Sequence, residues 1–242
     1  MLISKSNVIT TNTLTVTGGS LSSGVIANLK DSNFAKNVTS SSNTLTFTVG
    51  SVASSNYLAL HGLSLPVGSV VSVSATGFTK SFTTTRNSKN LFFYNDTATS
   101  FGTTTISITS VGTKTICYIA AGLYSYIAWG VDAGQSLYYL GTTSNARASV
   151  TSRGMPTNRV QEESAPNVSI KIKNALKTWA RTDLQQILEH YKTTGILSII
   201  DYELDDLPDE SVAGFDLGVS APTAHNQTLK LVDITLSLRI SA

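Results

Sequence analysis

The sequence predicts a mainly β protein, in which an N-terminal β-sandwich is followed by a small α+β domain with one short helix on an antiparallel sheet. Apolar and hydroxyl residues alternate along the first half, and Gly or Asn separates the alternating segments. Residues 1–115 contain 43 Ser and Thr but two acids, whereas the other 13 acids lie in residues 116–242. A clear amphipathic helix pattern occurs in this acid-containing half.

Hydroxyl side chains take the place of charges in the first half. Charged residues make up 13% of the chain, about half of the usual share. Thr is β-branched and fits a pleated surface, so its abundance favours strands. Apolar and aromatic residues continue along the whole chain, which excludes a disordered polypeptide. The first 115 residues carry a net charge of +5 and the remainder −3, which we interpret as solvated surface or, alternatively, as head-to-tail attraction between copies.

Weak charge and the absence of basic clusters argue against nucleic-acid binding. The single cysteine, Cys117, excludes an intrachain disulfide, and its apolar neighbours predict a buried, unreactive thiol. The first residues lack the apolar core of a signal peptide, and no apolar stretch approaches 18 residues. We therefore expect synthesis in the cytoplasm and no membrane span.

Strands are predicted from period-2 alternation. Residues 44–49 place Leu45, Phe47 and Val49 on one face and three threonines on the other, before Gly50 and Ser51 interrupt the run. The continuous apolar run 57–60 is typical of a buried strand. Further strands are expected at 70–75, 78–85, 91–96 and 105–111.

Aromatic residues concentrate in 115–140, where glycines divide the chain into two or three short strands or irregular segments that would close the sandwich. Tyr and Trp rings pack in cores and interfaces, which is their commoner use, or form flat platforms for sugars. The candidate interface or glycan-binding aromatics are Phe93, Tyr94, Tyr124, Tyr126 and Trp129.

A change in composition marks a domain boundary. Residues 141–167 contain few apolar side chains and two prolines, which is typical of a linker or long loop. The sequence therefore predicts a sandwich over residues 1–150 and an α+β domain over residues 151–242.

The second half predicts a strand at 168–173, a helix at 182–192 and a strand at 195–204. Thr182 is the expected N-cap of the helix, with Gln185 completing a capping box, and Gly195 is the expected stop. Residues 228–240 alternate throughout, which predicts a strand about 40 Å long. An exposed edge of that length would need a partner, so we take it as a sign of oligomeric use.

Motifs for catalysis and metal binding are absent from the sequence. We expect His61 at a strand end, His190 facing solvent and His225 in a polar loop, too far apart to form a zinc site. No nucleophile elbow or phosphate-binding glycine loop occurs. Four acids could bind a hard cation, but a solvated loop is the preferred interpretation: Asp205, Asp206, Asp209 and Glu210. We therefore expect no enzyme, cofactor or metal.

Two segments show a recurring frame. Residues 24–75 contain an Asn28–Leu29 opening, an alternating strand that ends near Gly50, and the segment Asn56–Gly62, and residues 152–176 begin Ser-Arg-Gly. The first segment resembles structural proteins of tailed bacteriophages that carry a galactose-binding-like jelly roll, and the second resembles the start of the C-terminal portion of such proteins. The resemblance covers about a third of the chain, and implies a jelly-roll-like sandwich in a minor tail or distal tail protein of the virion.

Two functions follow as hypotheses. As a tail or baseplate component, the chain would contact other virion proteins and identical copies in a ring. Alternatively, the sandwich would act as a carbohydrate-binding module for a host-surface glycan, through the aromatic residues. A sandwich fold does not by itself imply sugar binding.

Overall fold

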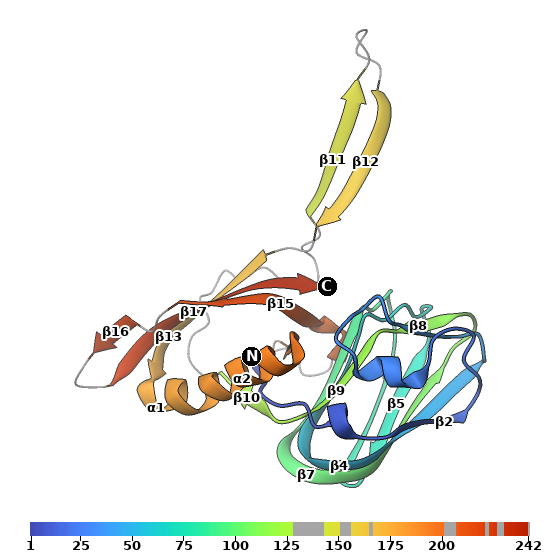
Figure 1. The fold of residues 1–242 in the computed structure, drawn as a ribbon, viewed down its shortest axis with the longest axis horizontal. Coiled ribbons are helices and arrows are strands. Elements are labelled where there is room, and N and C mark those ends of the chain that lie inside the picture. Colours follow the sequence, from blue (N-terminus) through green and yellow to red (C-terminus); the bar gives the residue numbers. More distant parts are fainter. Residues whose placement is uncertain are drawn as a thin grey trace.

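The computed structural model describes residues 1–127, 143–150, 156–164, 167–200, 207–220, 223–226 and 230–241. The fold is mainly β, as predicted. A β-sandwich lies beside an antiparallel sheet that carries the helical segment, and a two-stranded hairpin extends away from both (Figure 1).

The sandwich is built on a six-stranded antiparallel sheet with the order β2-β4-β7-β5-β6, in which β9 also pairs with β4. Its strands are β2 (Leu14–Gly18), β4 (Thr44–His61), β5 (Val70–Ala75), β6 (Phe78–Thr83), β7 (Asn90–Thr109) and β9 (Tyr118–Gly122). Each strand predicted within residues 44–111 lies in this sheet. The other side of the core is closed by β3 (Val38–Ser40), β8 (Lys114–Ile116) and the 3-10 turns η1 (Ile9–Thr11) and η2 (Ile26–Lys30).

Two long strands bend and continue where the sequence suggested that they end. The predicted break at Gly50 and Ser51 is a β-bulge: the register with β7 shifts between Val49 and Val52, and Ser51 has φ 53°. A second shift lies between Ser55 and Tyr57. Bulges bend a strand without ending it, so β4 runs for 18 residues. Its first half pairs with β2 and its second half with β9.

The second half of β4 is buried, as its continuous apolar run predicted, and the burial covers both faces. Leu58 and Leu60 point into the core of the sandwich. Tyr57 and Ala59 point the other way, into a cluster that also contains Ile200 of the second sheet. This two-sided burial joins the sandwich to the rest of the chain.

The opposite part of the sheet exposes hydroxyl groups, as the composition predicted. Hydroxyl oxygens of Thr46 and Ser107 lie 3.2 Å apart on adjacent strands, and those of Ser72 and Ser81 lie 3.0 Å apart. Such cross-strand pairs stabilise a sheet modestly without charges. The low charge of the first half is therefore explained by an outer face of Ser and Thr.

The second sheet combines both ends of the chain. Its order is β10-β1-β14-β15-β17-β13, and β16 pairs with β17. The strands are β1 (Leu2–Ser4), β10 (Tyr124–Tyr126), β13 (Asn167–Leu176), β14 (Leu197–Ile200), β15 (Ser211–Val219), β16 (Thr223–Asn226) and β17 (Leu231–Ser241). The predicted division near residue 150 stays a prediction, but the second sheet includes β1 and β10 from before that position.

The aromatic stretch therefore divides between the two units. Its β9 segment closes the sandwich as expected, whereas β10 pairs with Leu2–Ser4 in the second sheet. Trp129 and the remainder of the stretch lie outside the described residues.

The helical segment begins earlier than predicted. It comprises α1 (Lys177–Trp179), the π-helical turn η4 (Ala180–Leu184) and α2 (Gln185–Thr194). Thr182 is not an N-cap: its hydroxyl donates to the Thr178 carbonyl at 3.0 Å, inside the helix. Tertiary packing of Trp179 and Leu184 extends the helix past the capping signal. Gly195, with φ 71°, ends the helix as predicted.

The expectation that β17 is a long exposed edge is wrong. β17 pairs with β13 on one side and with β15 and β16 on the other. Its alternation was correctly interpreted, because Val232, Ile234 and Leu236 are buried against the helix layer. A central strand needs no external partner, so this strand gives no argument for oligomers.

The predicted linker contains a hairpin, β11 (Thr143–Val150) and β12 (Pro156–Ser164). The two strands pair with each other in an antiparallel register from Thr143–Ser164 to Val150–Pro156. Polar composition suggested a loop, but ladder hydrogen bonds between backbones do not require apolar side chains. The hairpin extends beyond the body of the molecule (Figure 1).

The acidic segment is not simply a solvated loop. Asp209, in the turn η6 (Pro208–Glu210), is buried and accepts hydrogen bonds from Arg86 at 2.9 Å and Ser88 at 3.1 Å. The carboxylate therefore links the second unit to the loop before β7. Asp205 and Asp206 lie outside the described residues.

The cluster that joins the sandwich to the second sheet is called the junction here, and removing an apolar side chain from it should destabilise the whole chain. Ile200→Ala deletes a side chain that is 2% exposed and should lower the free energy of unfolding by about 2–5 kcal/mol. Val111→Ala is the matched control, because Val111 is 90% exposed and its loss should change stability by less than about 0.5 kcal/mol. Urea denaturation measures both values, and equal stabilities would contradict the two-sided burial.

Candidate functional site

The candidate aromatics do not form an open platform. Phe93 is 4% exposed and belongs to the sandwich core. Tyr94 and Tyr124 lie edge-to-face with ring centroids 6.1 Å apart, and both are partly buried against the cluster between the two units. Tyr126 is 48% exposed at the end of β10. Trp129 lies outside the described residues.

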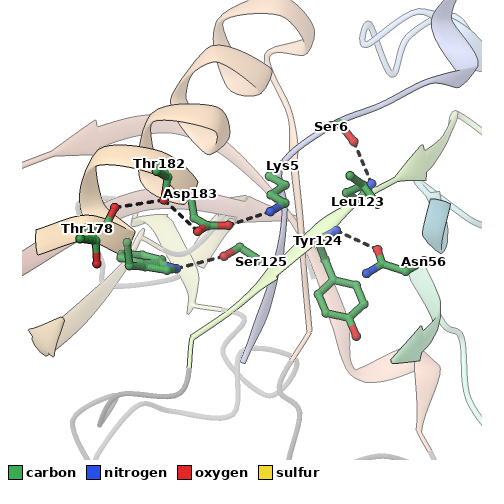
Figure 2. Close-up of polar contacts among 10 residues, drawn as sticks. Lys5, Ser6, Asn56, Leu123, Tyr124, Ser125, Thr178, Thr182 and Asp183 are labelled. Carbon is green, nitrogen blue, oxygen red and sulfur yellow. Dashed lines mark hydrogen bonds and ion pairs between the residues drawn. The ribbon is translucent and has the colours of Figure 1, made fainter. Parts of the chain in front are cut away.

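Tyr124 is held within the junction. Its backbone N–H donates to Asn56 Oδ1 at 3.0 Å (Figure 2), and its hydroxyl donates to the Asn95 carbonyl at 3.1 Å. These contacts join β10 to β4 and β7. The ring is therefore a packing element, which is the commoner use of Tyr in the sequence-based interpretation.

A polar cleft lies beside this junction, between the N-terminal segment and α2. Its volume is about 240 Å³. It is lined by Lys5, Ser6, Asn7, Gln186, Glu189, His190, Thr193 and Thr194. Every one of these side chains carries a hydrogen-bonding group, and none is aromatic except the imidazole. We call this feature the α2 cleft.

The N-terminal wall of the α2 cleft is fixed by hydrogen bonds. Ser6 Oγ accepts from the Leu123 N–H at 2.8 Å (Figure 2), and the Ser6 carbonyl accepts from the Tyr57 hydroxyl at 2.7 Å. Asn7 Nδ2 donates to the Tyr118 hydroxyl at 2.8 Å. Gly122 is required beside this wall, because a Cβ there would lie 2.4 Å from the Ser6 carbonyl oxygen. The wall is thus rigid before any ligand arrives.

An ion pair connects the N-terminal segment to the helical segment that contains α2. Lys5 Nζ lies 2.7 Å from Asp183 Oδ1, at the helical segment (Figure 2). Burial raises the pKa of Asp183, but the hydrogen bond and charge of Lys5 outweigh it, so the net pKa is lowered. Asp183 therefore stays ionised and partly neutralises Lys5.

The helix wall contains a buried histidine. His190 is 8% exposed, contrary to the expectation that it faces solvent, because the stripe of α2 that faces the sheet extends to this position. Burial lowers its pKa to about 4, so the imidazole is neutral near pH 7. No hydrogen bond of its ring is found within the described part of the chain, and the ring borders the α2 cleft.

His61 has a structural role instead. Its neutral ring donates from Nδ1 to Asn90 Oδ1 at 2.9 Å and accepts at Nε2 from the Ser198 hydroxyl at 2.7 Å. Burial lowers its pKa to about 4, and the Asn90 hydrogen bond opposes this shift. The ring bridges β4 and β14 and is fully buried, which makes it inaccessible to ligands.

Other chemistries find no support in the described residues. Within them, no group of three or more His, Cys, Asp or Glu could hold a metal ion. Cys117 is buried, and burial raises the pKa of its thiol, as the sequence predicted for an unreactive cysteine. No helix among the described residues is long and apolar enough to cross a bilayer.

Sequence reasoning missed the α2 cleft. Its walls are about 180 residues apart in the chain, and Lys5 and Asp183 show no common motif. The available signal was the helix stripe, since His190 lies three residues after the buried Ile187. A stripe predicts burial, but not which segment covers it.

Neither a family model nor a curated protein matches the chain. Among solved structures, a Streptococcus pneumoniae fucose binding module, SpX-3, is similar over 50% of this chain and 98% of its own, with 12% identity and a TM-score of 0.38. The family 32 module of C. perfringens NanJ in complex with galactose is similar over 52% and 100%, with 10% identity and a TM-score of 0.37. SpGH29 is similar over 50% of this chain and 28% of its own, with 11% identity and a TM-score of 0.39. These neighbours are mostly carbohydrate-binding modules, and a likeness at such identities concerns the fold alone.

Acid should destabilise the protein through its two buried histidines. Their pKa is about 4 in the folded chain and 6.5 when unfolded, so between these values the unfolded state takes up protons first. Stability is complete above pH 6.5 and falls by about 2 kcal/mol for each histidine by pH 5. Urea midpoints measured at pH 7 and pH 5 test this, and His61→Gln should remove about half of the loss. An unchanged pH dependence in His61→Gln would contradict the neutral buried ring.

Proposed function

We propose that the chain is a non-catalytic assembly subunit that associates with further copies of itself through the hairpin β11–β12. The hairpin carries this proposal. Its strands of eight and nine residues correspond to a length of about 25–30 Å. In the described pairing, neither strand joins the sandwich sheet or the second sheet.

An isolated two-stranded hairpin is marginally stable in water, and its outer edges present backbone groups that can pair with another strand. A second copy of the chain is the simplest partner, because both units of opposite net charge are present in every copy. Association would then place a positive sandwich near a negative second unit of the neighbour, by head-to-tail contacts that can close into a ring.

The assembly that we propose is a bacteriophage virion, with the chain as a minor tail or distal tail protein. The support is the resemblance of residues 24–75 and 152–176 to structural proteins of tailed phages. The uncharged Ser/Thr face of the sandwich fits a structural role, since it offers no catalytic group. Neighbouring virion proteins would be additional partners.

Self-association should depend on the hairpin. In sedimentation velocity, the full chain should form concentration-dependent oligomers, whereas a variant with residues 143–164 replaced by a short Gly-Ser loop should remain monomeric. The melting temperature should change little, because the hairpin adds no strand to either sheet. Val111→Ala, an exposed apolar change elsewhere, is the control and should associate normally. A full chain that stays monomeric at every concentration would sink the proposal.

The virion role predicts that purified phage particles contain the chain in a fixed copy number. Quantitative mass spectrometry of particles produced from the encoding genome should detect it in proportion to known tail proteins. Its absence from intact particles would exclude the virion role and leave self-association to be judged by sedimentation.

The second candidate is recognition of a carbohydrate on a host surface. The observation that favours it is the α2 cleft, whose lining consists of amide, hydroxyl and imidazole groups with one ammonium and one carboxylate. Both functions can reside in one chain, because the hairpin and the α2 cleft involve separate residues.

A further inference from the structure

We propose that the α2 cleft binds one uncharged sugar residue, with Gln186, Glu189 and His190 as its hydrogen-bonding partners. This inference rests on the recognition function proposed above and specifies its site and ligand class. It differs from the aromatic platform expected from sequence, because it uses no stacked ring.

His190 shows that the cleft is built to receive a polar group. His190 is 8% exposed and lines the cleft, and no hydrogen bond of its ring to the described residues is found. A ligand hydroxyl in the cleft can therefore hydrogen-bond the ring in place of water. A neutral imidazole offers one donor and one acceptor, as a sugar hydroxyl does.

The charges of the cleft select against anionic ligands. Lys5 is paired with Asp183, so its positive charge is partly neutralised. Glu189 accepts one hydrogen bond from Gln185 Nε2 at 2.9 Å and keeps further acceptor capacity. An anionic ligand would therefore meet the carboxylate of Glu189. A neutral ligand that both donates and accepts fits the mixed lining.

The remaining groups supply acceptors at fixed positions. Thr193 donates to the Glu189 carbonyl at 3.0 Å, so its hydroxyl oxygen is left to accept, whereas the Thr194 hydroxyl already donates to the His190 carbonyl and accepts from the Ile196 N–H. Gln186 offers an exposed amide with both donor and acceptor groups. A volume of about 240 Å³ equals about eight water molecules, which suits a single ring and not a chain of several sugars.

The rigid N-terminal wall lowers the entropy that is lost when a ligand binds, so a few hydrogen bonds are enough for measurable affinity. Ser6 and Asn7 are already held by the junction, so little ordering is lost when a ligand binds. Without an aromatic platform, affinity depends on a few exchangeable hydrogen bonds. We therefore expect a dissociation constant of about 1 mM, which corresponds to about 4 kcal/mol.

The test is a titration of the full chain with methyl β-galactoside, methyl β-glucoside, methyl α-fucoside and glucuronate, followed by NMR. At least one neutral glycoside should bind and shift the ring signals of His190, whereas those of the fully buried His61 should stay constant. Gln186→Ala should weaken binding about threefold to tenfold. Glu189→Gln should improve binding of glucuronate relative to the neutral sugar. Lys192→Ala, an exposed change on the same helix outside the lining, is the control.

The outcomes separate the site from the function. Gln186 and Glu189 are exposed on α2, so both variants should keep the melting temperature of the parent chain. Binding of a neutral sugar that is equal in all variants, with no shift at His190, would overturn the α2 cleft and leave carbohydrate recognition intact. No binding of any of the four probes would overturn both.

Discussion

The two-sided burial of Tyr57–His61 is the constraint on which the rest of the structure depends. Alternate side chains of this segment enter the sandwich core and the cluster shared with the second sheet. Neither set can move without exposing the other, because successive side chains of a strand point to opposite faces. The polar end of the segment is satisfied in the same way, with His61 hydrogen-bonded to both Asn90 and Ser198. The sandwich and the second sheet therefore pack as one body.

The same junction shapes the α2 cleft. Tyr57 and Tyr118, which belong to the buried cluster, direct their hydroxyls at the Ser6 carbonyl and the Asn7 amide. Burial raises the pKa of Tyr118 to about 12 and that of Tyr57 well above its ordinary value, so both hydroxyls keep their protons. The residues just before the N-terminal wall form β1, which lies between β10 and β14 in the second sheet. Tyr57 and Tyr118, neither of which is a candidate aromatic from the sequence, thus position a polar wall.

Local patterns predicted the elements well and their connections poorly. Alternation located β5 (Val70–Ala75) correctly, and the apolar run 57–60 was recognised as a buried strand. Bulges, however, depend on pairing with a neighbouring strand. Alternation alone therefore could not predict that β4 continues through Gly50. Burial of His190 and Asp209 depends on segments about 120–180 residues away, which no local pattern contains. The hairpin was missed because backbone pairing leaves little trace in a polar composition.

The chemical character of each surface explains why assembly would use the hairpin and recognition would use the α2 cleft. The outer sandwich sheet carries Ser and Thr, which hydrogen-bond across the strands at Thr46–Ser107 and Ser72–Ser81 and offer neither charge nor apolar area to a partner. An aromatic cluster that includes Tyr57, Phe92 and Tyr118 is buried at the junction between the two sheets. The hairpin offers backbone groups to a partner, and the α2 cleft offers polar side chains beside a wall that the junction already holds. Binding in the α2 cleft depends on preorganisation, because a rigid frame lowers the entropy lost on binding, whereas the hairpin depends on backbone pairing with a partner strand.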